Sequence, residues 1–421
     1  MLRIARNNAD SRGQFPHCMA AYKNTSRGFA IDMRHQEGVA LISLTVLLVL
    51  VGTYYFVNRF NNAQPDLVRS TAVDTRLASA KEALIGDAIA VDLNDSAILS
   101  NPDIGVPIGG NVEGYESGSF LGNNTDFNVA GKFPWKTLKT PPFRDSHGEC
   151  FWLVVSGRFK KTPLSNVPRN WDTPGQIDVI DGYGNPMATN LAALIIAPGP
   201  PLDAQNRKLD NPAYRECGGN YDARNYLDSF DAGDAIASEV NYFAGSINNR
   251  VASNTGNKGF VLAQTPHYND RLLFVTVDDV FRPLIRRSDF VQSINDLMNT
   301  IAASNPVPSA NKGTDNYTCS NTDAFCKNWK EMLFLAQLPV ASPITIDGTQ
   351  TTNCSKVLIF SGQRTGLQRR ATAAEKADKN NYLEAPNVVS FSAPIAFGVD
   401  FSGAGTFDWR RPATDILKCI P

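Results

Sequence analysis

The sequence predicts an α+β protein with a long N-terminal transmembrane helix and a β-rich ectodomain whose second half is an internal duplicate. Three features indicate this: an uncharged run near the N-terminus, turn-rich composition after it, and a loop pattern that occurs twice. We expect a leader at residues 1–38, a transmembrane and amphipathic helix at 39–92, an α+β domain at 93–300, and a second, related β-rich half at 317–421.

The overall composition limits the possible functions. The chain has 421 residues, is 43% hydrophobic and carries 40 basic against 41 acidic residues. It can therefore bury a sizeable core. Because the basic residues are scattered and balanced by acids, we expect no nucleic-acid partner.

The uncharged run covers residues 39–57, about the length of a helix that crosses the hydrocarbon core of a lipid bilayer. Basic residues are more frequent before the run than just after it, which places the N-terminus in the cytoplasm and the later chain outside. No small-x-small cleavage site follows, which disfavours a secretory signal peptide. Beyond the run, apolar residues recur at helical spacing and predict that the helix continues. They are Leu67, Leu77, Ala80, Leu84, Ala88 and Val91.

The residues at the start of the run resemble a known cleavage segment. The string RHQEG, ending at Gly38, is followed directly by VALIS from Val39, and is similar to the segment of the type IV prepilin and type II secretion pseudopilin superfamily. The resemblance implies that a prepilin peptidase cuts between Gly38 and Val39 and that Val39 is methylated. Leaders in this family are short, and a start at Met33 would give a leader that is six residues long. We therefore interpret residues 1–32 as the product of a misassigned start codon.

The resemblance also implies a structural function. It predicts a pilin-like ectodomain and a minor pilin or pseudopilin-like subunit of a type IV pilus or type II secretion assembly. Its partners would be other pilin-like subunits, through the N-terminal helix, and the lipid bilayer. The location would be the inner membrane, as a single-pass protein with a periplasmic ectodomain, or the cell surface in a filament.

Ser43 departs from that family, in which the fifth residue of the mature chain is usually glutamate. A carboxylate at membrane depth costs about 2.5–3.5 kcal/mol unless it is paired, and in the family its partner is the terminal amine of a neighbouring subunit. The serine favours a subunit at the tip or priming position, although it is equally compatible with a chain that never enters a filament. Two alternatives are a tip adhesin or substrate-recognition module on a pilin-like anchor, and a single-pass membrane-anchored extracytoplasmic enzyme.

We expect no enzymatic activity, because none of the familiar nucleophile, metal or phosphate-loop motifs is present. The histidines after the leader, His147 and His267, lie in turn-like segments and are more typical of surface residues than of general bases. A pair of carboxylates of the kind used by glycosidases stays open as a minor alternative.

Turn-forming residues around 178–186 suggest a tight turn that feeds a strand, similar to the turn that opens the β-meander of pseudopilins. In some pseudopilins such loops hold calcium. Asp178, Asp181 and Asn185 supply oxygen ligands at a plausible spacing for this ion. The alternative, which we favour, is that these residues only form the turn. No other cofactor is expected.

A pattern of apolar strand, Gly, Gln-x-Arg and Asn-Tyr-Leu-acid occurs twice. In the first copy Gly199 precedes Gln205 and Arg207, and in the second copy Gly362 precedes Gln368 and Arg370. Asn225-Tyr226-Leu227-Asp228 and Asn381-Tyr382-Leu383-Glu384 follow in turn. The repetition predicts a duplicated strand-loop-strand unit, either as a shared packing unit, which we favour, or as a shared binding loop.

Removal of the leader takes away Cys18 and leaves an even number of cysteines, which favours a disulfide framework. Cys319 and Cys326 are close enough in sequence to close a short loop. The proposed half boundaries pair Cys354 with Cys419, and Cys150 with Cys217. No cysteine or histidine spacing typical of zinc is present.

Overall fold

The computed structural model describes residues 36–94, 97–105, 113–118, 125–161, 167–202, 204–210, 216–228, 235–236, 239–247, 259–306, 314–316, 319, 323–392 and 400–421. At residues 36–43, 55–69, 235–236, 239–240, 314–316, 339–343 and 392 only the backbone is described. The chain forms two compact units, Met1–Asp66 and Leu67–Pro421. Both predicted parts of the ectodomain, 93–300 and 317–421, belong to the second unit.

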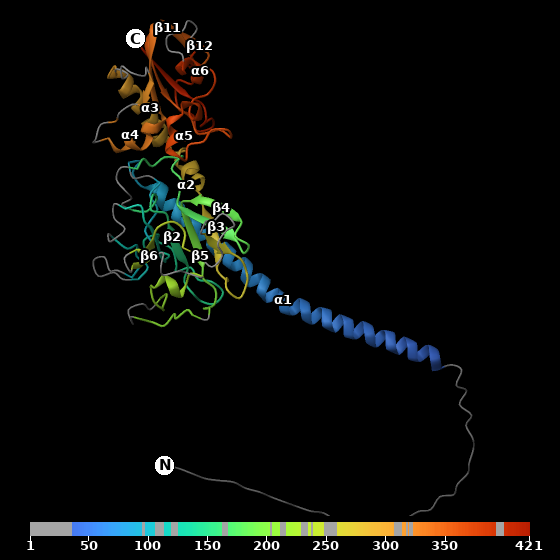
Figure 1. Cartoon of the computed structure of the whole chain (residues 1–421). Helices are drawn as coiled ribbons and strands as arrows, with labels where there is room; N and C mark the ends of the chain where they lie inside the picture. Colours follow the sequence, from blue (N-terminus) through green and yellow to red (C-terminus); the bar gives the residue numbers. More distant parts are fainter. Residues whose placement is uncertain are drawn as a thin grey trace, which may run out of the picture. The chain divides into compact units, whose positions relative to one another are not determined.

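The helix α1 (Gln36–Ala90) is continuous over 55 residues (Figure 1). Within the second unit, its apolar residues at three- and four-residue spacing form one buried face, as predicted for Leu77, Ala80, Leu84 and Ala88. Val73 extends this face by one turn. The helix is therefore held in the second unit by side chains from successive turns.

The predicted transmembrane helix is wrong. Among the residues that the structure describes, no helix combines the length and the apolar character needed to cross a membrane. The predicted inner-membrane, single-pass location depended on that helix and is wrong as well.

Polar contacts at the ends of the buried face add to its packing. Arg271 donates hydrogen bonds to Ser70 Oγ at 2.8 Å and to Asp74 at 3.0 Å. Lys81 Nζ lies 2.7 Å from Asp279 Oδ2. The Arg287 guanidinium donates to the carbonyl oxygen of Val91, at 3.0 Å, where the last carbonyls of the helix lack partners within the helix.

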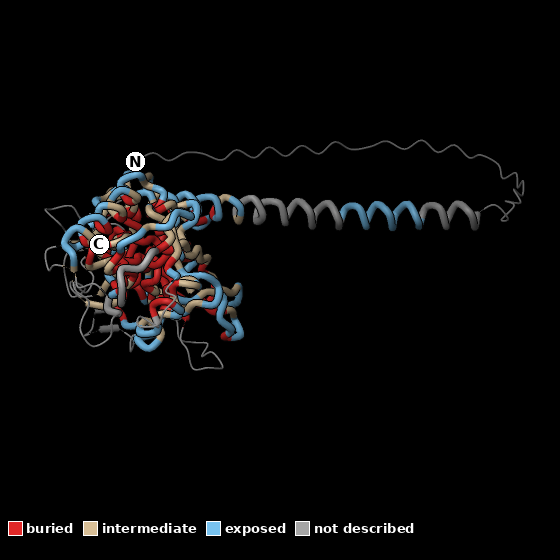
Figure 2. Tube along the Cα trace, turned by 90° about the horizontal axis from the view of Figure 1, so that it is seen from above, coloured by how far each residue is buried: buried red, intermediate tan, exposed pale blue. Residues whose placement is uncertain are grey.

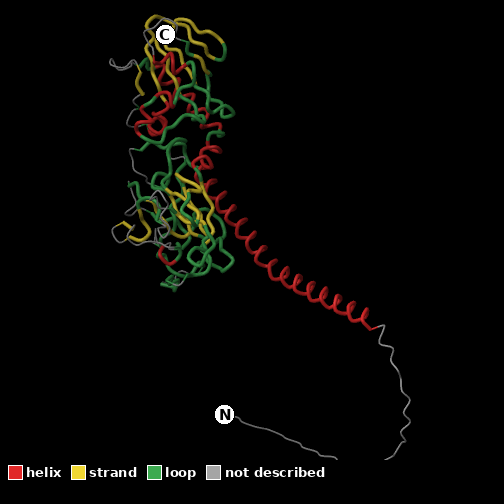
Figure 3. Tube along the Cα trace, turned by 45° about the vertical axis from the view of Figure 1, so that its right-hand side comes forward, coloured by secondary structure: helices red, strands yellow, loops and turns green. Residues whose placement is uncertain are grey.

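The first part of the second unit is built on two sheets (Figure 3). One has the order β6-β7-β1-β2-β5-β9, and its neighbours are antiparallel. The other has the order β4-β3-β8, in which β3 and β8 are parallel. Their strands are β1 (Asn128–Lys132), β2 (Trp152–Val155), β3 (Ile177–Asp181), β4 (Pro186–Leu191), β5 (Ala193–Ala197), β6 (Ala235–Ile236), β7 (Glu239–Phe243), β8 (Phe260–Leu262) and β9 (Arg271–Val275).

The later part combines helices with a sheet of order β10-β11-β12-β14, to which β13 is added by parallel pairing with β11. Its strands are β10 (Thr314–Asn316), β11 (Leu333–Ile346), β12 (Thr349–Phe360), β13 (Ser402–Gly403) and β14 (Ile416–Ile420). The helices are α2 (Val277–Leu284), α3 (Ser288–Ala303), α4 (Ala324–Trp329), α5 (Ala373–Ala377) and α6 (Asn387–Ser392). Short 3₁₀ turns occur at η2 (Ala223–Asn225), η4 (Lys330–Met332) and η5 (Lys379–Asn381).

The β6-β7-β1-β2-β5-β9 sheet and the β10-β11-β12-β14 sheet contain the same antiparallel arrangement of three strands. β2, β5 and β9 are adjacent in the former, and β11, β12 and β14 are adjacent in the latter. In each case the middle strand leads into the repeated loop and the last strand returns beside it. The observed strand order therefore agrees with a duplicated strand-loop-strand unit.

An aromatic cluster joins residues from distant parts of the second unit. Trp171, which precedes β3, packs edge-on against Trp329 of α4 with ring centroids 4.7 Å apart. It also contacts Phe360 of β12 and Phe407. Because these side chains belong to one buried core, the two predicted halves are packed together rather than joined by a linker alone.

Candidate functional site

The residues predicted for processing and assembly lie at the start of α1. Gly38, Val39 and Ser43 are within the helical backbone of α1, but their side chains are outside the described residues. Arg34 and His35 also lie outside the described part of the chain. Cleavage between Gly38 and Val39 and the assembly role of Ser43 therefore stay predictions.

Directly after these positions, α1 carries exposed apolar side chains. We call this stretch, Leu44 to Tyr54, the apolar segment. Leu47 is 60% exposed, Leu50 is 61% exposed and Tyr54 is 69% exposed, and Figure 2 shows this part of α1 as exposed. Within this segment, the Thr53 hydroxyl donates a hydrogen bond to the carbonyl oxygen of Val49 at 2.7 Å. Apolar surface of this kind on a protein commonly marks a surface that another molecule covers.

Of the residues suggested for calcium, Asp181 and Asn185 form the turn between β3 and β4, whereas Asp178 lies within β3. Asp181 Oδ1 accepts hydrogen bonds from the backbone N–H groups of Tyr183 and Asn185, each at 2.8 Å. Its Oδ2 accepts from Asn185 Nδ2 at 2.9 Å. Asp178 instead accepts from the backbone of Asn190 at 2.9 Å. Within the described residues, no group of three or more acidic, histidine or cysteine side chains could hold a metal.

Hydrogen bonds to Asp181 lower the pKa of its carboxyl group, first that from the Asn185 side chain. This is the expected effect of N–H donors on an ionised turn residue. The arrangement is that of an Asx turn, in which the carboxylate closes the chain on itself. Calcium binding at this position stays an untested prediction.

The first copy of the repeated pattern forms a loop around the Arg207 guanidinium. Arg207 donates to the carbonyl oxygen of Gly199 at 2.7 Å, to that of Asn225 at 2.8 Å and to Gln205 Oε1 at 2.7 Å. The guanidinium also lies 4.8 Å from the ring centroid of Tyr226. The Gly, Gln, Asn and Tyr of the repeated pattern thus all contact the arginine.

The second copy makes the same contacts around Arg370. Arg370 donates to the carbonyl oxygen of Gly362 at 3.1 Å, to that of Asn381 at 2.5 Å and to Gln368 Oε1 at 3.1 Å. Its guanidinium lies 4.3 Å from the ring centroid of Tyr382. We call the two structures the first and second arginine loops. The repeated sequence therefore encodes a repeated structure, and the arginine serves as its core in both copies.

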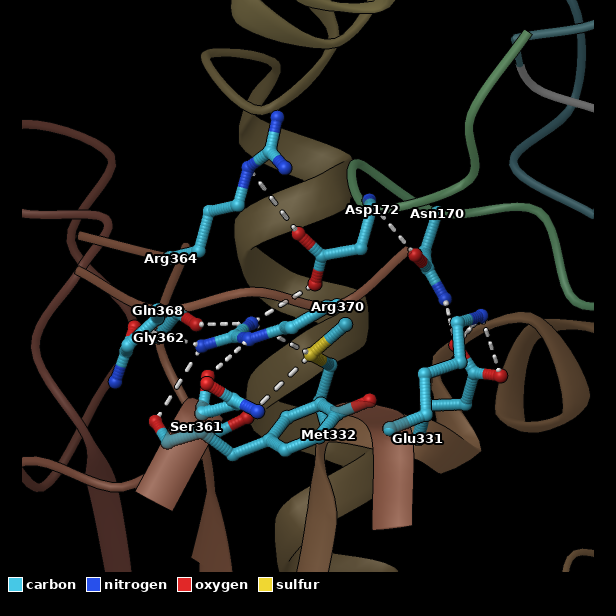
Figure 4. Close-up of polar contacts among 12 residues, drawn as sticks. Asn170, Asp172, Glu331, Met332, Ser361, Gly362, Arg364, Gln368 and Arg370 are labelled. Atoms are coloured by element: carbon cyan, nitrogen blue, oxygen red, sulfur yellow. Dashed lines mark hydrogen bonds and ion pairs between the residues drawn. The ribbon is translucent and has the colours of Figure 1, made fainter. Parts of the chain in front are cut away.

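The two arginines have different anionic partners. Arg207 lies 3.5 Å from Glu149, whose side chain is 25% exposed. Arg370 is fully buried and donates at 2.8 Å to Asp172, which is 1% exposed (Figure 4). Burial raises the pKa of Asp172, and the positive charge of Arg370 opposes that rise. The Asp172 segment comes from before β3, so this ion pair connects the two predicted halves.

Asp172 is held in place by its own neighbours. Asn170 Oδ1 accepts from the Asp172 backbone N–H at 2.9 Å, and Asn170 Nδ2 donates to the Asn328 carbonyl at 2.9 Å. Figure 4 shows Asn170 beside Glu331 and Asp172 facing Arg370 and Arg364. These hydrogen bonds fix the backbone that carries the Asp172 carboxylate.

A second feature of the arginine loops escaped the sequence analysis. The backbone N–H of Asp228 donates to Asp270 Oδ2 at 3.1 Å, and that of Asp270 donates back to Asp228 Oδ2 at 2.9 Å. Glu384 and Asp415 make the same reciprocal pair at 2.9 and 3.3 Å. The acidic partners lie 42 residues apart in one copy and 31 in the other, so a fixed-spacing pattern could not reveal them.

These carboxyl groups are buried, and burial perturbs their ionisation. Burial, with the charge of Asp228 as a second cause, raises the pKa of Asp270 well above its usual value. Burial also raises the pKa of Asp415 to about 6. Perturbed carboxyl groups can mark an active site, but here each accepts backbone hydrogen bonds that close a loop. Their arrangement therefore fits a structural role.

Within the described residues, the three predicted disulfides are present, Cys150–Cys217, Cys319–Cys326 and Cys354–Cys419. In the first bond, Cys150 lies just before β2, and its partner Cys217 lies in a segment of the first arginine loop. The last connects β12 to β14 within one sheet. Such bonds form in an oxidising environment.

No protein family model, curated protein or solved structure matches this chain.

Proposed function

We propose that this chain is a structural subunit of a filament of pilin-like proteins, and that the apolar segment of α1 packs against the equivalent helices of neighbouring subunits. The observation that carries the proposal is the exposure of apolar side chains along one part of α1. Val46 to Val51 are each more than half exposed, whereas the later part of α1 buries a face within the second unit. Exposed apolar helix surface is costly in water and is stabilised by packing against similar helices.

The prepilin-like string before the apolar segment supports the same function. Cleavage between Gly38 and Val39 would place the apolar segment from the sixth residue of the mature chain onward. Ser43 in place of the family's glutamate favours a minor subunit at the tip or priming position. The second unit, with its disulfides and duplicated loop, would then be the part exposed on the assembly.

Two substitutions in the apolar segment test the proposal. Leu47→Gln and Leu50→Gln should abolish incorporation of the full chain into filaments, because each puts an amide into a helix–helix interface. Leu367→Gln, at a leucine that is 95% exposed in the second unit, is the matched control and should assemble normally. Filament recovery by shearing and pelleting, with detection of the chain, measures the outcome. Normal assembly of both segment variants would exclude the proposed interface.

Analysis of the mature N-terminus tests the processing step separately. Edman sequencing or intact mass of the chain recovered from producing cells should give Val39 as the first residue. A mature chain that retains residues 34–38 would contradict the pilin-like reading and would favour an anchored protein of another class. Ser43→Glu should be tolerated, or should move the subunit to internal filament positions, if Ser43 marks a subunit without a neighbour above it.

A further inference from the structure

Beyond the proposed filament role, a pocket beside the second arginine loop has the composition of an anion site. Its volume is about 600 Å³. Arg282 and Arg286 come from α2 and the turn after it, Arg364 follows β12, and Arg410 precedes β14. We propose that this pocket binds a small organic polyphosphate, a molecule that presents at least two phosphate groups on one short scaffold.

The walls of the pocket are fixed by close backbone contacts. The backbone N–H of Gln363 donates to the carbonyl oxygen of Pro412 at 2.6 Å. Next to it, a Cβ placed on Gly362 would lie 2.0 Å from the Ala413 carbonyl oxygen, so the close approach of these two segments requires glycine. These contacts hold the segments that carry Arg364 and Arg410 close together.

The guanidinium groups are oriented by specific neighbours. The Trp409 ring contacts two of them, with its centroid 5.2 Å from Arg286 and 4.8 Å from Arg410. Arg364 Nε lies 4.0 Å from Asp172 Oδ1, on the carboxylate that Arg370 already neutralises (Figure 4). Such contacts limit the freedom of the guanidinium planes and lower the entropy lost when a ligand binds.

The carboxylates near the pocket are too few to balance these charges. Asp278 is the carboxylate among the described lining residues. Asp408 lies just outside and is shared between Arg410 at 3.8 Å and Arg411 at 3.5 Å. The side chains of Arg282, Arg286, Arg364 and Arg410 are exposed to solvent, and so are accessible to a ligand. The pocket thus carries an excess of positive charge.

The choice of ligand follows from the chemistry and the size of the pocket. A guanidinium presents two parallel N–H donors that match the oxygens of a phosphate group. Arginines from three chain segments would each engage a different phosphate oxygen. A single phosphate ion would fill only a small part of about 600 Å³ and would engage fewer of the lining arginines. A molecule with several phosphates matches the guanidinium donors and is large enough to contact more than one arginine at once.

Calorimetric titration of the full chain with tripolyphosphate tests this inference. We expect tripolyphosphate to bind at least about tenfold more tightly than orthophosphate or citrate at the same ionic strength, because it engages more guanidinium groups. Equal affinity for all three anions would overturn the proposal. So would at least tenfold tighter binding of a short single-stranded oligonucleotide that carries the same number of phosphates.

Variants assign the binding to the pocket. Arg282→Gln and Arg286→Gln should each weaken tripolyphosphate binding by about tenfold, because each removes a charge-assisted pair. Arg369→Gln is the matched control, since Arg369 is exposed and does not line the pocket; it should change the affinity less than twofold. An equal loss in the control would show that binding depends on overall charge and would overturn the site. Unchanged melting temperatures of the variants confirm that the fold is intact, and failure of this test leaves the filament proposal unaffected.

Discussion

Arg370 Nη1 donates a 2.8 Å hydrogen bond to Asp172 Oδ2, and this buried ion pair joins residues that are 198 positions apart in the sequence. The repeat in the sequence identifies Arg370 as a member of a loop, but the structure shows that its charge is balanced from outside the loop. A buried ion pair adds little net stability when intact, because both charges lose hydration. Loss of one partner is different, since it leaves a buried charge unpaired.

Asp172→Ala should lower the free energy of unfolding by about 3–5 kcal/mol, because Arg370 then has no carboxylate partner in the core. Arg370→Met in the same background should add less than its own single loss, since the unpaired charge is removed together with the hydrogen bonds of the loop. Urea unfolding of the single and double variants measures the coupling. Strictly additive losses would contradict direct pairing of the two side chains.

The first arginine loop supplies the control for that experiment. Glu149 occupies the position of the anion there, but it is partly exposed and lies 3.5 Å from Arg207. Glu149→Ala should cost about 1 kcal/mol or less, as is typical of solvent-screened pairs. Equal losses of unfolding free energy in Glu149→Ala and Asp172→Ala would show that the deeper burial of Asp172 does not make its removal more costly.

Asp415 gives the stability of the protein a defined pH dependence. Burial raises the pKa of this carboxyl group from 3.8 to about 6 in the folded protein. The folded state therefore binds the proton more tightly than the unfolded state, and the free energy of unfolding falls as the pH rises from about 4 to about 6. The decrease attributable to Asp415 is about 3 kcal/mol. Denaturant titrations at several pH values measure it.

In the Asp415→Asn variant, the free energy of unfolding should fall less steeply as the pH rises from about 4 to about 6. The decline that persists in the variant belongs to other buried carboxyl groups, such as Asp103, whose pKa burial also raises to about 6. Asp408→Asn is the control, because the backbone N–H of Arg410 lowers the pKa of that exposed group, so its removal cannot flatten a decline of this sign. An unchanged slope in Asp415→Asn would mean that Asp415 is not protonated in this range.

The sequence could predict local features and those that depend on spacing. The buried face of α1, the cysteine pairs and the arginine loops follow from helical period, even cysteine count and repetition. It could not predict Asp172 as the partner of Arg370, because the pair depends on how distant segments pack. It also could not reveal the pocket arginines, which come from three segments with no common spacing.

The disulfides should differ in their contribution to stability according to the loop that each closes. Cys150 and Cys217 are separated by 67 positions, whereas Cys319 and Cys326 are separated by 7. Loss of the first bond frees more conformational entropy in the unfolded chain, so Cys150→Ser/Cys217→Ser should cost about 4 kcal/mol and Cys319→Ser/Cys326→Ser about 2.5 kcal/mol. Thermal and urea unfolding of the two double variants measure the difference. A larger loss from the short loop would contradict this order.

The two parts of α1 should respond differently to the same substitution. Leu84 is fully buried in the second unit, so Leu84→Ala should lower the free energy of unfolding by about 2–5 kcal/mol through lost packing and a residual cavity. Leu50 is 61% exposed, so Leu50→Ala should change that free energy by less than about 0.5 kcal/mol.

If the apolar segment packs against neighbouring subunits, Leu50→Ala should instead weaken association of the full chain. Urea unfolding and analytical ultracentrifugation measure the two effects separately. Loss of unfolding stability without loss of association in Leu50→Ala would show that this residue packs within its own chain, and the apolar segment would then have no role in assembly.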